Sequence, residues 1–168
     1  MIESGIEAEL VRVLRDYSHT LSFCESLTAG LACATLANVP GASVVLRGGL
    51  VTYATDLKGS LAGVPAEVLA EHGPVSPVTA EHMARGAQRV CGSDWAVALT
   101  GVAGPTPQDG HPVGEVYVAV AGPTRTIAVR APLIRGDRQA IRTAAVTAGL
   151  TVLRREIEAW EQKEGMVR

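Results

Sequence analysis

The sequence predicts an α/β protein: a three-layer α/β/α sandwich in which helices cover both faces of a mixed parallel and antiparallel sheet. Segments with helical spacing of apolar residues alternate along the chain with short β-rich segments, a pattern typical of α/β folds. Hydrophobic residues make up 47% of the chain and aromatic residues only 4%, so Ala, Val and Leu build a core on which helices can pack closely. A length of 168 residues suits one domain, and we expect residues 1–168 to form it.

The first half of the chain predicts four helices and two strands. Ser4 and Glu7 have the spacing of a capping box, and apolar residues recur at helical spacing after them. Pro40-Gly41 ends the second helix, and glycine bounds the β-rich segment that follows. The expected elements are, in order, a helix over about 6–17, a buried strand ending near 24, a helix over about 31–38, a strand over 48–53, and short helices over 56–61 and 65–71.

The second half predicts a helix, a strand, a hairpin and a long final helix. Ser76-Pro77 opens a helix that ends near Cys91-Gly92, because proline is favoured in the first turn and glycine after the last. Residues 94–99 form a buried strand that delivers Thr100 to its carboxyl end. Residues 113–121 and 125–131 alternate in part around a Gly-Pro-Thr turn, which predicts an antiparallel hairpin. Asp137 then caps a helix that reaches about Trp160.

The bulk properties favour a cytoplasmic protein that acts on a small molecule. A formal net charge of −2 gives no electrostatic case for nucleic acid as the main partner. No apolar run reaches the ~18 residues of a membrane span, and the first residues lack the order of a signal peptide. The three cysteines lack CxxC spacing, the four histidines lack HxxxH spacing, and no P-loop motif occurs, so we expect reduced thiols, no metal and no cofactor.

Three groups of polar residues follow predicted strands, at the edge where open α/β sheets bind ligands. They are Ser26, the turn from Tyr53 to Lys58, and the loop from Thr100 to Gly104. Ser26 lies between a buried strand and a helix, beside unpaired backbone N–H groups and the positive end of the helix dipole. That setting suits a nucleophile or a hydroxyl that binds an anion.

The use of basic residues draws attention to Lys58. Of the 15 basic residues, 13 are arginine and only Lys58 and Lys163 are lysine. A desolvated lysine can lose its proton, which arginine cannot, so Lys58 is a candidate base for Ser26 in a Ser–Lys arrangement, with Tyr53 as a possible relay. Gly101 and Gly104 would let backbone N–H groups approach a substrate oxygen, and Arg138 at the start of the last helix favours an anionic group.

The same residues also allow purely structural readings, and spacing alone leaves these open. Ser26 or Thr28 fits a helix N-cap, which is the commoner use of such residues. Tyr53 fits a strand residue with its hydroxyl in water, and the 100–105 segment fits a tight turn. Arg138 fits a surface ion pair with Asp137 or Glu115.

Seven separated motifs resemble one family, the C-terminal domain of the competence/damage-inducible protein CinA. They cover nearly the whole chain and read Glu25-Ser26-x-Thr28-x-Gly30, Pro40-Gly41-Ala42-Ser43, Val51-Thr52-Tyr53 with Lys58, His72-Gly73-Pro74-Val75-Ser76, Thr100-Gly101-Val102-Ala103-Gly104-Pro105, Pro112-Val113-Gly114 and Gly136-Asp137-Arg138. The resemblance implies a CinA C-terminal domain-like fold. Stand-alone members of the family include amidohydrolases that convert nicotinamide mononucleotide to nicotinic acid mononucleotide and ammonia.

The resemblance also implies roles for individual residues. The active serine of the family falls on Ser26, and the lysine and tyrosine thought to assist it fall on Lys58 and Tyr53. Substrate contacts are expected from the residues Glu25, Thr28, Gly30, Gly49, Thr100, Gly101, Gly104 and Arg138, with the ribose phosphate as the target of Arg138. The family tends toward dimers, so a homodimer is expected.

This chain departs from the family at the nucleophile motif. The family usually reads Glu-Ser-Cys-Thr-Gly-Gly, whereas this chain has Leu27 and Ala29 at the third and fifth positions. Ala29 adds a Cβ where the backbone is expected to approach substrate or take a positive φ. Two alternatives to the amidohydrolase therefore stay open: a catalytically silent nucleotide-binding or interaction module, and an amidase for a related substrate.

Overall fold

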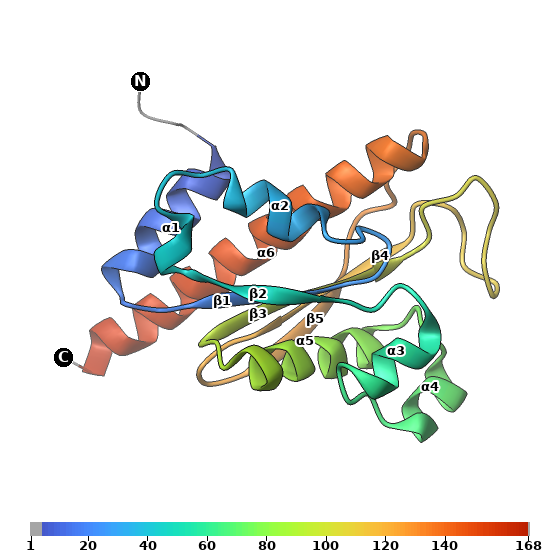
Figure 1. The fold of residues 1–168 in the computed structure, drawn as a ribbon, viewed down its shortest axis with the longest axis horizontal. Coiled ribbons are helices and arrows are strands. Elements are labelled where there is room, and N and C mark those ends of the chain that lie inside the picture. The colour runs from blue at the N-terminus through green and yellow to red at the C-terminus, as the bar shows by residue number, and fades with distance from the viewer. Residues whose placement is uncertain (1–4, 168) are drawn as a thin grey trace.

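The computed structural model describes residues 5–167 and contains a five-stranded sheet with the strand order β2-β1-β3-β4-β5 (Figure 1). The strands are β1 (Leu21–Glu25), β2 (Leu46–Val51), β3 (Trp95–Gly101), β4 (Val116–Ala121) and β5 (Thr126–Arg130). β1 pairs in parallel with β2 and β3, while the β3–β4 and β4–β5 pairs are antiparallel. The predicted mixed sheet is confirmed.

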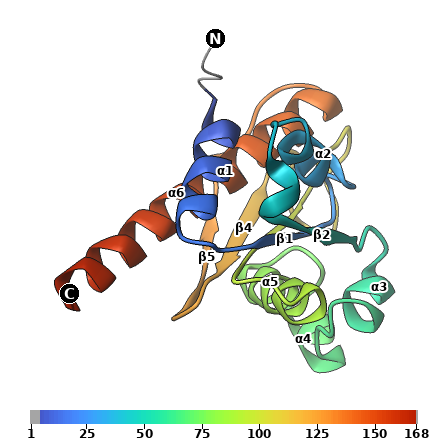
Figure 2. The ribbon, with the colours of Figure 1, turned by 60° about the vertical axis from the view of Figure 1, so that its left-hand side comes forward.

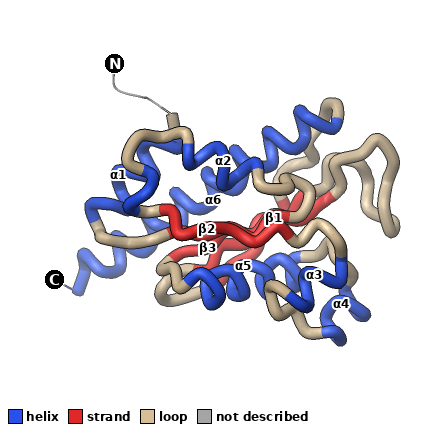
Figure 3. The backbone as a smooth tube through the Cα atoms, viewed as in Figure 1, coloured by secondary structure: helices blue, strands red, loops and turns tan. Residues whose placement is uncertain are grey.

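Helices cover both faces of this sheet, as the two views in Figures 1 and 2 show. One layer holds α1 (Ile6–Asp16), α2 (Leu31–Ala37) and the long α6 (Arg138–Val167). The other holds α3 (Thr55–Ser60), α4 (Ala66–His72) and α5 (Pro77–Cys91), and a short 3-10 helix (Ala42–Val44) precedes β2. The tube in Figure 3 shows the strands between these layers, so the predicted three-layer sandwich is confirmed.

The two faces of the sheet carry different side chains, which sets how closely the helices approach. The face toward α6 buries large residues such as Phe23, Val97 and Leu99. The face toward α5 buries alanines 96, 98, 119 and 121 of β3 and β4. Small residues of α5, alanines 80, 84 and 87, belong to the same buried cluster. Gly86 of α5 lies against the turn after α3, where a Cβ would collide with the backbone of Ala62. The alanine-rich composition therefore serves close helix–sheet packing, as predicted.

Several element ends differ from the sequence predictions. β2 spans 46–51 instead of 48–53, because its pairing with β1 ends where Glu25 meets Val51. Thr100 lies within β3, since that strand stays paired with β4 as far as Gly101. The last helix continues to Val167, past the expected end at Trp160. The predicted capping box depends on Ser4, which lies outside the described residues; the residue before the first helical position is Gly5.

The parallel strands fix where a site can form. β1, β2 and β3 all run in one direction and end at Glu25, Val51 and Gly101, at the same edge of the sheet. The segments that follow them begin with Ser26, Thr52 and Val102, so residues far apart in sequence meet there.

Candidate active site

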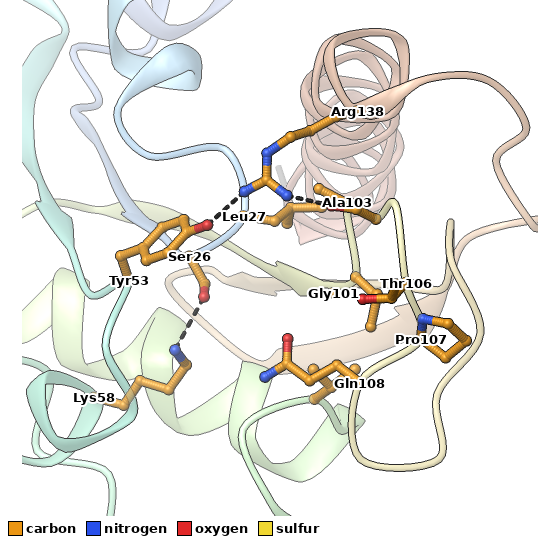
Figure 4. Close-up of a pocket in the computed structure, with 13 residues that line it drawn as sticks. Ser26, Leu27, Tyr53, Lys58, Gly101, Ala103, Thr106, Pro107, Gln108 and Arg138 are labelled. Atoms are coloured by element: carbon orange, nitrogen blue, oxygen red, sulfur yellow. Dashed lines mark hydrogen bonds between the residues drawn. The ribbon is translucent and has the colours of Figure 1, made fainter.

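A buried hydrogen bond joins Ser26 to Lys58. Ser26 follows the last residue of β1, and its backbone N–H donates to the carbonyl of Leu99 in the neighbouring strand at 2.9 Å. Lys58 lies on α3 with only 1% of its surface exposed. Its Nζ lies 3.0 Å from Ser26 Oγ and 2.7 Å from the carbonyl oxygen of Thr52, as Figure 4 shows for the first contact. The sheet and α3 therefore place the two predicted groups in direct contact.

The surroundings of Lys58 favour its neutral amine. Burial lowers the pKa of Lys58, because the charged ammonium loses its hydration, while a charge on Cys24 would act in the opposite direction. Burial also raises the pKa of the Cys24 thiol to about 11, so near neutral pH that thiol carries no charge. Among the described residues Lys58 has no carboxylate within ion-pair distance. The amine can then donate to Thr52 and accept the proton of Ser26.

The helix after Ser26 is capped by a residue that precedes the serine. The N-cap position of α2 is Gly30, whose left-handed backbone carries no capping side chain. The Glu25 carboxylate instead accepts hydrogen bonds from the backbone N–H of Ala32 at 2.7 Å and of Cys33 at 3.1 Å. The alternative of an N-cap at Ser26 or Thr28 is therefore wrong, and the Ser26 hydroxyl is left for Lys58.

The loop between Ser26 and α2 is strained and is held from α6. Ala29 has φ +49°, the left-handed conformation expected for the glycine that it replaces. Arg142 on α6 donates from Nε to the carbonyl of Leu27 at 2.9 Å and from Nη2 to that of Thr28 at 3.0 Å. No local pattern indicates this role, because Arg142 is distant from the loop in the chain and resembles any other arginine of a helix.

Tyr53 and Arg138 form the rim of the site. The Tyr53 side chain is 54% exposed, and its hydroxyl accepts a hydrogen bond from Arg138 Nη2 at 2.6 Å. Arg138 Nη1 donates to the carbonyl of Gly104. Arg138 thus bridges the turn after β2 and the loop after β3, instead of pairing with Asp137 or Glu115 (Figure 4). Asp137 accepts from the N–H of Ala140 at 2.8 Å, which confirms it as the cap of α6.

These residues surround a cavity of about 330 Å³. Six of the predicted site residues line it: Ser26, Tyr53, Lys58, Gly101, Gly104 and Arg138. The other five do not line it: Glu25, Thr28, Gly30, Gly49 and Thr100. Thr100 donates from its hydroxyl to the carbonyl of Pro74 at 2.6 Å, and a Cβ on Gly49 would collide with Cys33 Sγ. Packing explains both residues without a ligand.

Sequence reasoning missed one whole wall of the cavity. Thr106, Pro107 and Gln108 line it from the loop that follows Gly104, and Leu27 and Val75 add apolar contacts. The only sequence signal was the polar, proline-containing composition of residues 105–112, which predicts a loop but not its direction. Residues 5–167 contain no cluster of three or more His, Cys, Asp or Glu that could hold a metal ion, and no helix among them is long and apolar enough to cross a bilayer.

The site consists of a buried Ser–Lys pair beside a small cavity, at the carboxyl end of an α/β sheet. These features are typical of a protein that binds a small molecule next to a serine able to act as a nucleophile. Comparison with known proteins places the chain more closely. A family model described as the CinA C-terminal domain matches residues 3–157. The chain therefore belongs to the CinA C-terminal domain family.

Relatives and solved structures agree with this assignment. A CinA-like protein of Frankia casuarinae is 41% identical over 162 residues, covering 96% of this chain and 37% of that protein. A CinA-like protein of Gloeobacter violaceus is 46% identical over 147 residues, covering 84% and 34%. The chain thus spans about a third of the length of these curated relatives.

Two solved structures match over most of their length. The competence damage-inducible protein A (ComA) of Klebsiella pneumoniae has a TM-score of 0.88 and 31% identity, covering 92% of this chain and 96% of that one. The competence/damage inducible protein CihA of Agrobacterium tumefaciens has a TM-score of 0.84 and 33% identity, covering 88% and 91%. At these identities the likeness extends beyond the fold to the family.

Proposed function

We propose that this chain is an amidohydrolase that converts nicotinamide mononucleotide to nicotinic acid mononucleotide and ammonia, with Ser26 as the nucleophile. The observation that carries the proposal is the 3.0 Å contact between Lys58 Nζ and Ser26 Oγ, made by a lysine that is almost fully buried. A lysine without a counter-ion in such a place costs stability unless it is neutral, and a neutral amine is a base. A purely structural role would be served as well by an apolar residue.

The first half of the proposed reaction forms an ester on Ser26. Lys58 takes the hydroxyl proton while Ser26 Oγ attacks the carboxamide carbon, which gives a tetrahedral intermediate. Lys58 then returns the proton to the amide nitrogen, the C–N bond breaks, and ammonia leaves. The Thr52 carbonyl, 2.7 Å from Nζ, stabilises the transient ammonium and directs the remaining lone pair of the neutral amine toward Ser26.

The second half removes the acyl group. Water gives a proton to Lys58 and adds to the ester carbon, the bond from that carbon to Ser26 Oγ breaks, and Lys58 reprotonates the serine. The oxyanion in both halves needs nearby N–H donors. The N–H of Ser26 already donates to Leu99, whereas no hydrogen bond of the Leu27 N–H is found within residues 5–167. Leu27 also lines the cavity, so its N–H is our candidate oxyanion donor.

We place the phosphate of the nucleotide at the rim. Arg138 lies in the first turn of α6, where its guanidinium and the helix dipole both favour an anion. The guanidinium also touches the Tyr53 hydroxyl, so phosphate binding there would order the turn that carries Lys58. Gly101 and Gly104 line the same cavity as Ser26 and Arg138.

The test is ammonia release from nicotinamide mononucleotide by three proteins: wild type, Ser26→Ala and Lys58→Arg. We expect release by wild type, and loss of it by at least about 10³-fold in both variants, because one lacks the nucleophile and the other a group able to accept a proton. Full activity in Lys58→Arg would exclude the proton-transfer role. Binding of the nucleotide by calorimetry without release from wild type would favour the silent nucleotide-binding module instead.

We also propose the homodimer that the family resemblance implies. Size-exclusion chromatography with light scattering measures it directly. A mass near twice the 17.5 kDa of the chain supports the dimer, and a mass near that of one chain at micromolar concentration contradicts it.

A further inference from the structure

We infer that Arg142 is a positioning residue that holds the Ser26 loop in its reactive conformation and offsets the strain that Ala29 introduces. The inference rests on the proposed function, because it concerns the reactivity of Ser26. Arg142 does not line the cavity, so any effect on the reaction must pass through the loop.

The loop carries two costs that would favour its relaxation. Ala29 adopts φ +49°, a conformation that is unfavourable for an L-residue because its Cβ crowds the following carbonyl oxygen. The Thr28 hydroxyl oxygen is buried and has no hydrogen-bond partner among the described residues, which also disfavours the folded loop. Such strain persists only where the surroundings over-determine the backbone.

Arg142 on α6 holds the loop backbone in this conformation through hydrogen bonds to its carbonyl groups. It is half-buried, and its guanidinium binds two consecutive carbonyls, those of Leu27 and Thr28, at 2.9 and 3.0 Å. The planar fork of arginine fixes both peptide planes at once, which a lysine ammonium cannot do. Glu25 fixes the far end of the same segment through the N–H groups of Ala32 and Cys33.

Holding the carbonyls also aims the N–H groups. In a planar trans peptide the carbonyl and the next N–H point in opposite directions. When Arg142 draws the Leu27 carbonyl toward α6, the N–H of Thr28 is directed to the other side. The Ser26 carbonyl is held separately by the N–H of Ala29 at 3.1 Å, which sets the direction of the Leu27 N–H. The Leu27 N–H, our candidate oxyanion donor, and the peptide plane after it are thus held in fixed directions before substrate binds.

The experiment compares wild type, Arg142→Met, Arg142→Lys, and the double variant Ala29→Gly with Arg142→Met. Arg154→Met is the matched control, because Arg154 also lies on α6 but pairs with Glu9, Glu158 and Glu161, away from the loop. We expect kcat of Arg142→Met to fall about 10²-fold with KM changed less than about threefold, since a shift near 1 Å suffices for such a loss. Arg142→Lys recovers only part of this loss.

The double variant separates positioning from simple loss of stability. Glycine accepts the left-handed conformation without strain, so Ala29→Gly should restore kcat of Arg142→Met about tenfold, while adding little to wild type. Equal losses in Arg142→Met and Arg154→Met, or no recovery in the double variant, would overturn the inference.

Two further readouts keep the inference testable if the substrate is wrong. The rate at which a fluorophosphonate labels Ser26, followed by mass spectrometry, needs no nucleotide and should fall in Arg142→Met but not in Arg154→Met. Amide hydrogen exchange at Ala29 and Leu31, whose N–H groups donate to the carbonyls of Ser26 and Thr28, should speed up in the same variant. Normal labelling of wild type without ammonia release would reject the proposed substrate alone, whereas unchanged exchange in Arg142→Met would reject the positioning role alone.

Discussion

The two walls of the cavity are built in opposite ways. On one wall, Ser26 and Lys58 are buried, and Lys58 is hydrogen-bonded to protein groups. On the facing wall, Thr106, Pro107 and Gln108 are exposed, and the Gln108 side chain points into the cavity without a hydrogen-bond partner among the described residues (Figure 4). Burial is what changes the pKa of a lysine, so the first wall suits proton transfer. A polar side chain that makes no hydrogen bond to the protein is available to bind a ligand, so the second wall suits substrate binding.

The exposed wall is nevertheless well anchored. Gln108 and His111 exchange two backbone hydrogen bonds at 3.1 and 2.8 Å across the tip of the loop. Asp109 and Gly110 between them have φ +49° and +80°, as a tight two-residue hairpin turn requires. His111 Nδ1 lies 3.0 Å from Glu115 Oε2, and a buried carboxylate can only accept that bond. The exposed loop therefore has a well-defined backbone, although the Gln108 side chain is free to bind a ligand.

The largest expected effect comes from removing the amine of Lys58 from the buried wall. Lys58→Met keeps the apolar stem but removes the amine, so we expect ammonia release to fall by about 10³-fold or more. The folded protein should become more stable at neutral pH. The pKa of Lys58 is lowered on folding, so between that lowered value and about 10.5 the unfolded chain binds a proton that the folded chain does not. The stability of wild type then rises with pH through this window.

Thermal melts of both proteins at pH 7 and at pH 10 measure this difference. The gain from Lys58→Met should be larger at pH 7 and shrink as the pH approaches 10.5. A variant that is less stable than wild type at pH 7 would show that the lysine is charged and compensated in the folded protein.

A change in the exposed wall should act on binding instead. Gln108→Leu removes one neutral hydrogen-bonding group from the cavity, and we expect KM for nicotinamide mononucleotide to rise about tenfold with kcat nearly unchanged. Steady-state kinetics measure both constants. Asp109→Asn is the control, because asparagine keeps the tight turn and residue 109 does not line the cavity. A fall in kcat as large as the rise in KM would contradict the prediction that the exposed wall acts on binding alone.

Glu115→Gln tests the anchor of the exposed wall. Burial alone would raise the pKa of Glu115, which is 5% exposed, but hydrogen bonds from Tyr117 and His111 and the charge of Arg130 outweigh burial and lower it. The carboxylate therefore stabilises the fold above its ordinary pKa of 4.5, and this contribution is lost as pH falls through the lowered value. We expect Glu115→Gln to cost about 1–2 kcal/mol at pH 7 and less at pH 3, measured by urea unfolding. An equal cost at both values would show that the charge is irrelevant.

The smallest expected effect concerns the backbone beside Ser26. Ala29→Gly removes the strain of a left-handed alanine but increases the freedom of the unfolded chain. We expect a net stabilisation of about 1 kcal/mol or less, seen as a small rise in the melting temperature. A loss of stability would show that Ala29 is not strained in the folded protein.

The sequence predicted the fold well because its signals are local. Each signal acts within a few residues of the chain. Helical spacing of apolar residues predicts the helices, Ser76-Pro77 predicts the start of α5, and the Gly-Pro-Thr turn predicts the hairpin of β4 and β5. These elements all form. The errors at the ends of β2 and β3 arise because strand pairing decides where those strands end. Thr100 belongs to β3 only because β4 stays beside it as far as Gly101, and no residue near Thr100 signals that partner.

The site was predictable where residue type limits the chemistry, and not where it depends on long-range contacts. A rare lysine in an arginine-rich chain and a serine after a buried strand made Lys58 and Ser26 candidates, and the family resemblance singled them out. The structure brings the two side chains into contact. Arg142 reaches Leu27 across 115 positions in the chain, and Gln108 enters the cavity through the direction of a loop. Neither contact leaves a pattern in the local sequence. The family resemblance predicts that Glu25 contacts substrate, but its carboxylate binds the N-terminus of α2.

The most direct test of the account is the titration of Lys58 itself. Because the chain has only two lysines, selective ¹³C labelling of lysine gives two side-chain signals, and Lys163→Arg assigns them. We predict that the Lys58 signal titrates below the 10.5 of an ordinary lysine, and that kcat/KM for ammonia release rises over the same pH range. A Lys58 that stays protonated throughout the range in which the activity rises would contradict its role as the base for Ser26.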